Sequence, residues 1–130
     1  MSSPSGLRYL DTHEWARLDG REVVVGITRF AVDALQDLVF IDLPDAGAAV
    51  TAKKAFGEIE SVKAVADLNA PVAGTVSEIN VSVEEHLEIL SRDPWNQGWL
   101  IKLEPRTKSL DGPELMDAQA YEAFITASKH

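Results

Sequence analysis

Several short runs of the chain are rich in β-branched residues or alternate apolar and polar positions, which is typical of β-strands. Each run is four to eight residues long, and turn residues such as Gly, Pro, Asp and Asn separate the runs. They span residues 21–27, 38–43, 56–61, 74–81 and 99–103. Many short strands with frequent turns predict a mainly β fold, built as a sandwich or a flattened barrel.

Two similar segments flank the middle of the chain. Ala46-Gly47 and Ala73-Gly74 each precede a segment that contains Val. This faint repetition indicates a pair of pseudo-symmetric β-hairpin units.

Helices are expected to be few and short. Thr28 is a suitable N-cap for a short helix. The apolar face of that helix would carry Phe30, Ala34 and Leu35. Residues 83–90 have room for one or two further turns.

The clearest helical pattern lies near the C-terminus. Asp117 can serve as the N-cap of this helix. Tyr121, Phe124 and Ile125 follow at the spacing of a single helical face. We expect the helical segment 113–127 to pack on the β core rather than to bind a partner, because most such stripes face a core.

Length and charge narrow the class of protein. A chain of 130 residues predicts a single domain, 1–130, in which residues 1–6 form a loose tail. The 12 Lys and Arg against 21 Asp and Glu give a formal net charge of −9. This charge repels a phosphate backbone and argues against nucleic acid as a partner. No apolar run is long enough to span a membrane and residues 1–8 lack the features of a signal or transit peptide, so we expect a bacterial, cytoplasmic protein.

The sequence holds few arrangements that are typical of enzymes. Cysteine is absent, which excludes disulfides, zinc–thiolate sites and cysteine nucleophiles. The three His residues, His13, His86 and His130, are not spaced as metal ligands. Glu58 and Glu60 share one face of an expected strand, and a solvated outer face is the commoner use of such a pair than acid–base catalysis. We therefore expect a protein that performs no catalysis alone.

Residues 56–65 contain two strand-like runs with no Gly, Pro or Asn-Gly between them. The turn is therefore expected near residues 61–64, with Lys63 at its tip. A lysine at such a tip can reach outward on its four-carbon stem. The residue types alone do not distinguish this use from an ordinary solvated lysine.

The segment around Lys63 resembles a known attachment site. Glu60-Ser61-Val62-Lys63-Ala64, preceded by Phe56-Gly57 and followed by residues 69–74, is similar to the lipoyl-attachment segment of the H proteins of the glycine cleavage system. His13-Glu14-Trp15 resembles the opening motif of that family. The combination of these motifs in this order is specific, whereas each piece alone would carry less weight.

The resemblance extends along most of the chain, from Tyr9 to Pro105. Residues 93–102 resemble the closing strand of the family, and residues 121–124 resemble its C-terminal helix. The chain departs from the family at Gln36, where the family usually has Gly, and at residues 86–90, where it usually has Pro. These departures concern a helix end and a loop, and they leave the attachment segment intact.

The resemblance implies the hammerhead fold of lipoyl and biotinyl carriers: a flattened β-barrel or sandwich of two pseudo-symmetric sheets, with short helices and a C-terminal helix. It also implies lipoate in amide linkage on Lys63, within an attachment motif formed by Glu60, Ser61, Val62 and Ala64. A lysine amine is almost entirely protonated at neutral pH and is a poor nucleophile. Attachment therefore needs a separate lipoate ligase or octanoyl/lipoyl transferase.

The resemblance implies three further partners. Glycine decarboxylase, with pyridoxal phosphate, would load an aminomethyl group onto the carrier, and aminomethyltransferase would pass its carbon to tetrahydrofolate. Dihydrolipoyl dehydrogenase, with FAD and NAD, would receive the electrons. The hard chemistry belongs to these partners and their cofactors.

A loaded aminomethyl group hydrolyses in water, so a carrier gains from holding it in a protected cleft. Because the amine is a cation, the cleft should offer a carboxylate and a hydroxyl near apolar walls. The resemblance assigns this storage role to Glu14 and Asp67, with the Thr12 hydroxyl nearby. Alternatively, His13-Glu14-Trp15 is a folding motif that buries Trp15, and both interpretations can hold together.

Three alternative functions remain open at this point. A biotinyl carrier has a similar architecture, but it usually has Met on both sides of the lysine, where this chain has Val62 and Ala64. A relay would hand lipoyl or octanoyl groups to other lipoate-dependent proteins. A plain binding module would leave Lys63 unmodified.

Overall fold

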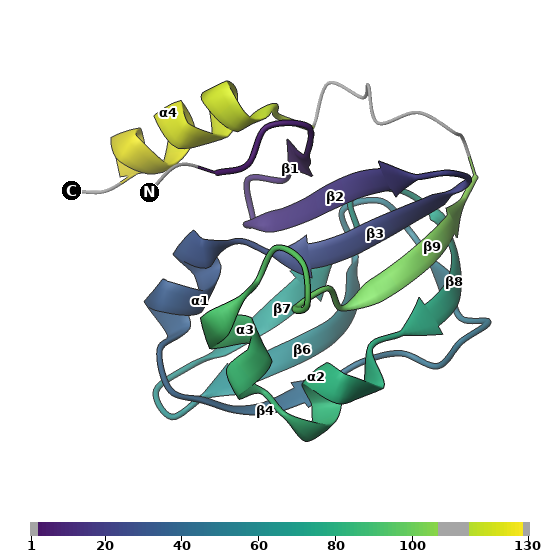
Figure 1. Ribbon diagram of the computed structural model, residues 1–130, viewed down its shortest axis with the longest axis horizontal. Helices are drawn as coiled ribbons and strands as arrows, with labels where there is room; N and C mark the ends of the chain where they lie inside the picture. The colour runs from purple at the N-terminus through teal and green to yellow at the C-terminus, as the bar shows by residue number, and fades with distance from the viewer. Residues whose placement is uncertain (1–2, 107–114, 129–130) are drawn as a thin grey trace.

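The computed structural model describes residues 3–106 and 115–128 and contains two antiparallel sheets (Figure 1). The larger sheet has the strand order β1-β2-β3-β9-β8-β5, and the smaller has the order β4-β6-β7. The strands are β1 (Arg8–Tyr9), β2 (Glu14–Asp19), β3 (Glu22–Ile27), β4 (Leu38–Asp42), β5 (Ala49–Val50), β6 (Ala55–Ser61), β7 (Val65–Asn69), β8 (Gly74–Ile79) and β9 (Ile101–Pro105). The expected mainly β architecture is confirmed, and within the described residues the two sheets do not close into a barrel.

The described residues form four helices: α1 (Arg29–Leu35), α2 (Val81–Glu85), α3 (Glu88–Arg92) and α4 (Ala118–Ser128). The C-terminal helix α4 begins directly after Asp117, the residue predicted as its N-cap, whereas residues 115–117 of the expected helical segment are not helical. The Asp117 side chain caps it by accepting a hydrogen bond from the Ala120 backbone nitrogen (2.8 Å). Residues 113–114 of the expected helical segment lie outside the described residues.

One hydrophobic core fills the space between the two sheets. The larger sheet contributes residues such as Val25 and Leu103, and the smaller sheet contributes Ile41, Ile59 and Leu68. All five side chains are buried. Full burial of one such side chain stabilises the fold by roughly 1.5–3 kcal/mol, so these contacts hold the smaller sheet, and the turn it carries, against the larger one.

A second apolar cluster joins α4 to β1, β2 and β3, and Figure 1 shows α4 next to β1 at the edge of the larger sheet. Tyr121 of α4 stacks on Tyr9 of β1, with ring centroids 4.6 Å apart. Trp15 is fully buried in this cluster, as the folding interpretation of the His13-Glu14-Trp15 motif requires. Gly26 pairs with Trp15 across β2 and β3, and a Cβ at Gly26 would lie 2.5 Å from the indole ring.

The run expected as a strand over 74–81 ends earlier, at Ile79, because the chain turns into α2. The buried side chain of Asn80 makes this turn. Its Nδ2 donates to the backbone carbonyls of Gln97 (2.9 Å) and Trp99 (2.7 Å). The run expected over 99–103 correspondingly enters β9 only at Ile101.

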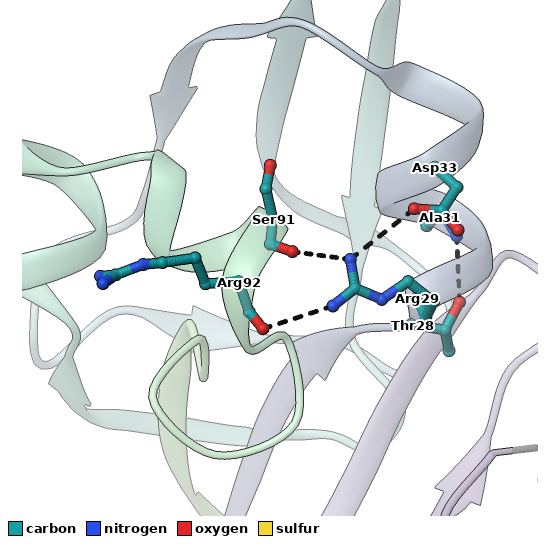
Figure 2. A network of polar contacts seen from close by, with 6 residues as sticks. All are labelled: Thr28, Arg29, Ala31, Asp33, Ser91 and Arg92. Atoms are coloured by element: carbon teal, nitrogen blue, oxygen red, sulfur yellow. Dashed lines mark hydrogen bonds and ion pairs between the residues drawn. The ribbon is translucent and has the colours of Figure 1, made fainter. Parts of the chain in front are cut away.

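Thr28 caps α1 as predicted, because its Oγ1 accepts a hydrogen bond from the Ala31 backbone nitrogen at 3.2 Å (Figure 2). The predicted apolar face of this helix was partly wrong. Val32 is the buried residue, and Ala34 is exposed. The helix has only seven residues, so its contact with the core, and not the spacing of its own apolar residues, decides which side chain is buried. That contact buries Val32.

Arg29 ties α1 to the end of α3 (Figure 2). Its guanidinium donates to the backbone carbonyls of Ser91 (2.7 Å) and Arg92 (3.5 Å). It also pairs with Asp33 one turn further along α1, at 3.7 Å. These contacts satisfy carbonyls that the last turn of α3 leaves without helical partners.

The described part of the expected N-terminal tail is hydrogen-bonded. The backbone nitrogen and the hydroxyl of Ser3 donate to the Glu122 carboxylate of α4 (2.8 and 2.5 Å). The Tyr9 hydroxyl donates to the Pro4 carbonyl (2.5 Å). Residues 1–2 lie outside the described residues.

Candidate functional site

The turn that joins β6 to β7 is built around the buried side chain of Ser61. The Ser61 hydroxyl oxygen accepts hydrogen bonds from the backbone nitrogens of Lys63 (3.3 Å) and Ala64 (3.0 Å). The Ser61 backbone nitrogen donates to the Ala64 carbonyl (2.8 Å), and the Val62 nitrogen donates to the Asp37 carbonyl (2.9 Å). The backbone of the turn is thus held by Ser61 and Ala64 within it and by Asp37 from outside it, and the expected turn is present with Lys63 between the two strands.

Lys63 is exposed at this turn, and within residues 3–106 and 115–128 no hydrogen bond or ion pair engages its ammonium group. Val62 is 75% exposed, and Ala64 and Val65 are exposed as well. A side chain on such a projecting turn can enter the cleft of another protein without any movement of the sheet.

An acidic row crosses the outer face of the smaller sheet. Asp42 of β4 pairs in register with Glu58 of β6, which pairs with Asp67 of β7. All three side chains are exposed, because the alternating residues Ile41 and Leu68 point into the core. The expected outer position of Glu58 is therefore observed, and this face carries negative charge beside the lysine turn.

The next row along the same face is partly apolar. Phe40 pairs with Glu60, and Glu60 pairs with Val65. Phe40 and Val65 are 52% and 60% exposed, whereas Glu60 between them is half-buried. The surface next to Lys63 thus combines exposed apolar side chains with carboxylates.

Glu14, the first residue of β2, is buried with only 1% of its surface exposed. One carboxylate oxygen accepts a hydrogen bond from the Thr12 hydroxyl. The other accepts from the backbone nitrogen (2.8 Å) and the side-chain amide (3.2 Å) of Asn69 in β7. Burial raises the pKa of Glu14 to about 7, against the opposing effect of these donors. The carboxyl group therefore changes charge near neutral pH.

The structure brings Thr12 and Glu14 together but places Asp67 differently. Asp67 is exposed and lies two residues before Asn69, on the same face of β7. Asn69, the first residue of the motif over 69–74, is the residue that contacts Glu14 from β7. The alternation of β7 could have suggested this, because residues 67 and 69 share a face. Nothing in the sequence indicated that β2 approaches that end of the strand.

Comparison with known proteins assigns the family. The family "Glycine cleavage H-protein" matches residues 7–128. The chain belongs to the glycine cleavage H-protein family. It is 48% identical to the glycine cleavage system H protein of Beutenbergia cavernae over 97% of this chain and 98% of that one. It is 43% identical to that of Geobacillus kaustophilus over 96% and 98%. The crystal structure of a glycine cleavage system H protein from Mycobacterium marinum matches 95% of this chain and 99% of that one, with a TM-score of 0.87 and 36% identity.

Family membership confirms several expectations from the sequence. Glycine cleavage H proteins are non-catalytic carriers that hold lipoate covalently on a lysine. They serve glycine decarboxylase, aminomethyltransferase and dihydrolipoyl dehydrogenase in the glycine cleavage system, and this chain is such a carrier. The choice between lipoate and biotin is thereby decided in favour of lipoate.

Gln36, where the chain departs from the family, ends α1 as its C-cap with a φ of 65°. This left-handed backbone conformation favours glycine. The Gln36 backbone nitrogen still donates to the Val32 carbonyl (3.0 Å), so the helix end keeps its closing hydrogen bond.

Two further observations concern the part of the chain that the structure describes. None of its helices is long and apolar enough to cross a membrane. No group of three or more His, Asp or Glu side chains there is placed to bind a metal ion.

Proposed function

We propose that Lys63 is the lysine that carries lipoate in this chain. The observation that carries the proposal is an exposed ammonium group, without a partner among the described residues, at a turn whose backbone Ser61 holds in place. A long acyl group attached there would meet no steric obstacle from the exposed neighbours Val62 and Ala64. When bound, lipoate supplies the pair of sulfur atoms that carry the aminomethyl group and the two electrons.

The residues of the attachment motif serve different purposes in this proposal. Ser61 fixes the turn through its hydroxyl group, so Lys63 is presented in one orientation. Val62 and Ala64 keep the approach to the amine open for a lipoate ligase or an octanoyl/lipoyl transferase. Glu60 lies half-buried next to the turn and adds negative charge to the outer face of the smaller sheet. Rigid presentation lowers the entropic cost of entering a partner's cleft.

The proposed storage site for the aminomethyl cargo consists of Glu14, Thr12 and Asp67. An aminomethyl group is a cation, and a buried carboxylate at Glu14 would bind it more strongly than an exposed one. The cation would in turn favour the ionised form of Glu14, whose pKa burial has raised to about 7. The Thr12 hydroxyl donates to one oxygen of this carboxylate, and that oxygen keeps a second lone pair for the cationic cargo.

Asp67 would act before the aminomethyl cargo reaches Glu14. It lies four residues after Lys63, on the strand β7 that follows the lysine turn. Because it is exposed between the lysine turn and Asn69, it can attract the cation towards Glu14. We further propose the cytoplasm as the place of action, on the bacterial origin of the relatives; cell fractionation tests this point.

The attachment site is tested with intact-mass measurements on the variant Lys63→Arg, co-expressed with a lipoate ligase. The variant keeps the positive charge but cannot form the amide, so we expect no lipoyl addition and loss of glycine cleavage in a reconstituted system. Lys54→Arg is the matched control, because Lys54 is also exposed and lies at the far end of the same hairpin. A lipoyl addition that persists in Lys63→Arg, or disappears in Lys54→Arg, would contradict the proposal. Octanoyl and biotinyl additions have different masses and would reveal the alternative functions.

A further inference from the structure

The backbone just before Glu14 adopts an unusual conformation. His13 has a φ of 77°, in the left-handed region that is unfavourable for a residue with a Cβ. It closes a tight loop in which the His13 nitrogen donates to the Leu10 carbonyl (3.0 Å) and the Leu10 nitrogen donates to the Glu14 carbonyl (2.9 Å). Such a conformation persists only where the surroundings hold it.

The side chain of His13 is held by residues from distant parts of the chain. Its ring lies 4.6 Å from the ring of Phe30 and 6.0 Å from that of Phe124, measured between centroids. Its Nδ1 atom lies 2.8 Å from the Tyr121 hydroxyl of α4. The Thr28 backbone nitrogen donates to its carbonyl oxygen (3.0 Å). The loop is thus clamped between α1 and α4.

The Tyr121 hydroxyl is the centre of this clamp, because it also lies 2.8 Å from the Thr28 hydroxyl. Thr28 in turn accepts the hydrogen bond from Ala31 that caps α1 (Figure 2). One assignment of donors and acceptors uses both hydroxyl protons within this group. In it, the Thr28 hydroxyl donates to the Tyr121 hydroxyl, which donates to an unprotonated Nδ1 of His13; this direction of donation runs towards His13. Burial lowers the pKa of His13 and so favours the neutral ring that this direction needs.

We propose that Tyr121 is a positioning residue for the storage site: its hydroxyl holds His13 in the left-handed conformation that directs the Glu14 carboxyl towards Asn69. The inference rests on the proposed storage role of Glu14. Because residues 12, 13 and 14 are consecutive, a change in the backbone at His13 moves the Thr12 hydroxyl and the Glu14 carboxyl together. The C-terminal helix thereby acts on a site formed by β2 and β7 without touching the cargo.

The variant Tyr121→Phe removes the hydroxyl but keeps the ring that stacks on Tyr9. The matched control is Tyr9→Phe, which loses a hydroxyl from the other ring of the same stack, where it donates to Pro4 and not to His13. Both variants keep the apolar cluster, so both are expected to fold.

The first measurement uses the unloaded full-length protein, with NMR titration of the Glu14 carboxyl and of the His13 ring nitrogens. In Tyr121→Phe we expect the Glu14 pKa to fall towards its ordinary value, because a relaxed loop admits water, and the Nδ1 signal to lose its hydrogen-bond shift. In Tyr9→Phe both should stay as in the wild type. If each hydroxyl has a purely structural role, its loss should lower the unfolding midpoint of both variants but leave the pKa of Glu14 unchanged in both. That result would overturn the proposal.

The second measurement is the lifetime of the aminomethyl group on the loaded carrier. We expect about a fivefold shorter lifetime in Tyr121→Phe, the factor that one hydrogen bond of ordinary strength contributes to an equilibrium, and no change in Tyr9→Phe. Glu14→Gln separates the two proposals. A wild-type lifetime in Glu14→Gln would refute storage at Glu14, whereas the pKa shift in Tyr121→Phe would still decide whether Tyr121 positions it.

Discussion

At the scale of single residues, Glu14 carries a carboxyl group that burial keeps partly protonated near neutral pH. The Thr12 hydroxyl and the two nitrogens of Asn69 compensate only part of the lost hydration. Ionisation of a buried carboxyl group costs free energy, so its contribution to the free energy of unfolding depends on pH. The same property that would serve a cationic cargo therefore affects the stability of the unloaded protein.

Glu14 predicts a specific pH dependence of stability. Its pKa is raised from 4.5 to about 7 in the folded state, so the folded protein binds more protons than the unfolded chain between these values. The contribution to stability is fully present below pH 4.5 and is lost as the pH rises through about 7. Relative to the wild type, Glu14→Gln should gain about 3 kcal/mol in unfolding free energy between pH 4 and pH 8. Urea unfolding of the wild type and of Glu14→Gln at a series of pH values measures this difference, and a difference that stays constant with pH would contradict the prediction.

At the scale of secondary-structure elements, the short helices depend on contacts beyond their own turns. The helix α1 has seven residues and α3 has five, lengths at which an isolated helix is not stable. Thr28 caps the start of α1, and Arg29 joins α1 to the carbonyls that end α3 (Figure 2). These contacts fix α1 beside the His13 loop, so they would support the proposed storage site indirectly.

The contacts of Arg29 should contribute unequally to the free energy of unfolding. Arg29→Gln removes the hydrogen bonds to the Ser91 and Arg92 carbonyls and should cost about 1 kcal/mol. Asp33→Asn removes only the ion pair with Arg29, and because Asp33 is 65% exposed it should cost no more than a few tenths of a kcal/mol. Chemical denaturation of both variants decides the order. Equal losses would contradict the prediction, because they would mean that the ion pair within α1 accounts for the whole effect and the carbonyl contacts between α1 and α3 add nothing.

At the scale of the whole molecule, the chain combines a formal charge of −9 with an acidic row on the outer face of the smaller sheet, whose strands β6 and β7 are joined by the Lys63 turn. Charges of one sign on a docking face steer partners that carry the opposite sign, and dissolved salt screens this attraction. The exposed Phe40 and Val65 on the same face provide apolar contact once a partner has arrived. A carrier that visits several enzymes in turn needs fast association rather than tight binding.

Electrostatic steering predicts that the rate of lipoyl attachment by a ligase falls as salt rises, by about tenfold between low and high ionic strength. The double variant Asp42→Asn with Glu58→Gln should be slower at low salt and less sensitive to salt. Asp19→Asn with Glu104→Gln changes the net charge equally at exposed positions of the other sheet. Stopped-flow or discontinuous mass assays measure the rates. A flat salt response in the wild type, or identical behaviour of the two double variants, would exclude steering by the acidic row.

The features that the sequence predicted correctly are mostly local in origin. The strands over 21–27 and 56–61, the turn at Lys63 and the caps of α1 and α4 follow from residue types within a few positions of one another. The predicted face of α1 failed because contact with the core, and not the helix's own pattern, selected Val32.

The sequence by itself determined the strand-rich pattern, the exposed lysine at a tight turn and the family, because these depend on local preferences and on the order of motifs. Only the tertiary structure decided that Asn69 holds Glu14, that Tyr121 reaches His13 across 108 positions and that the pKa of Glu14 rises. The physical reason is that burial and hydrogen bonding depend on which distant segments meet. No local pattern of residues specifies these contacts between distant segments. They arise when β7 and α4 pack around β2.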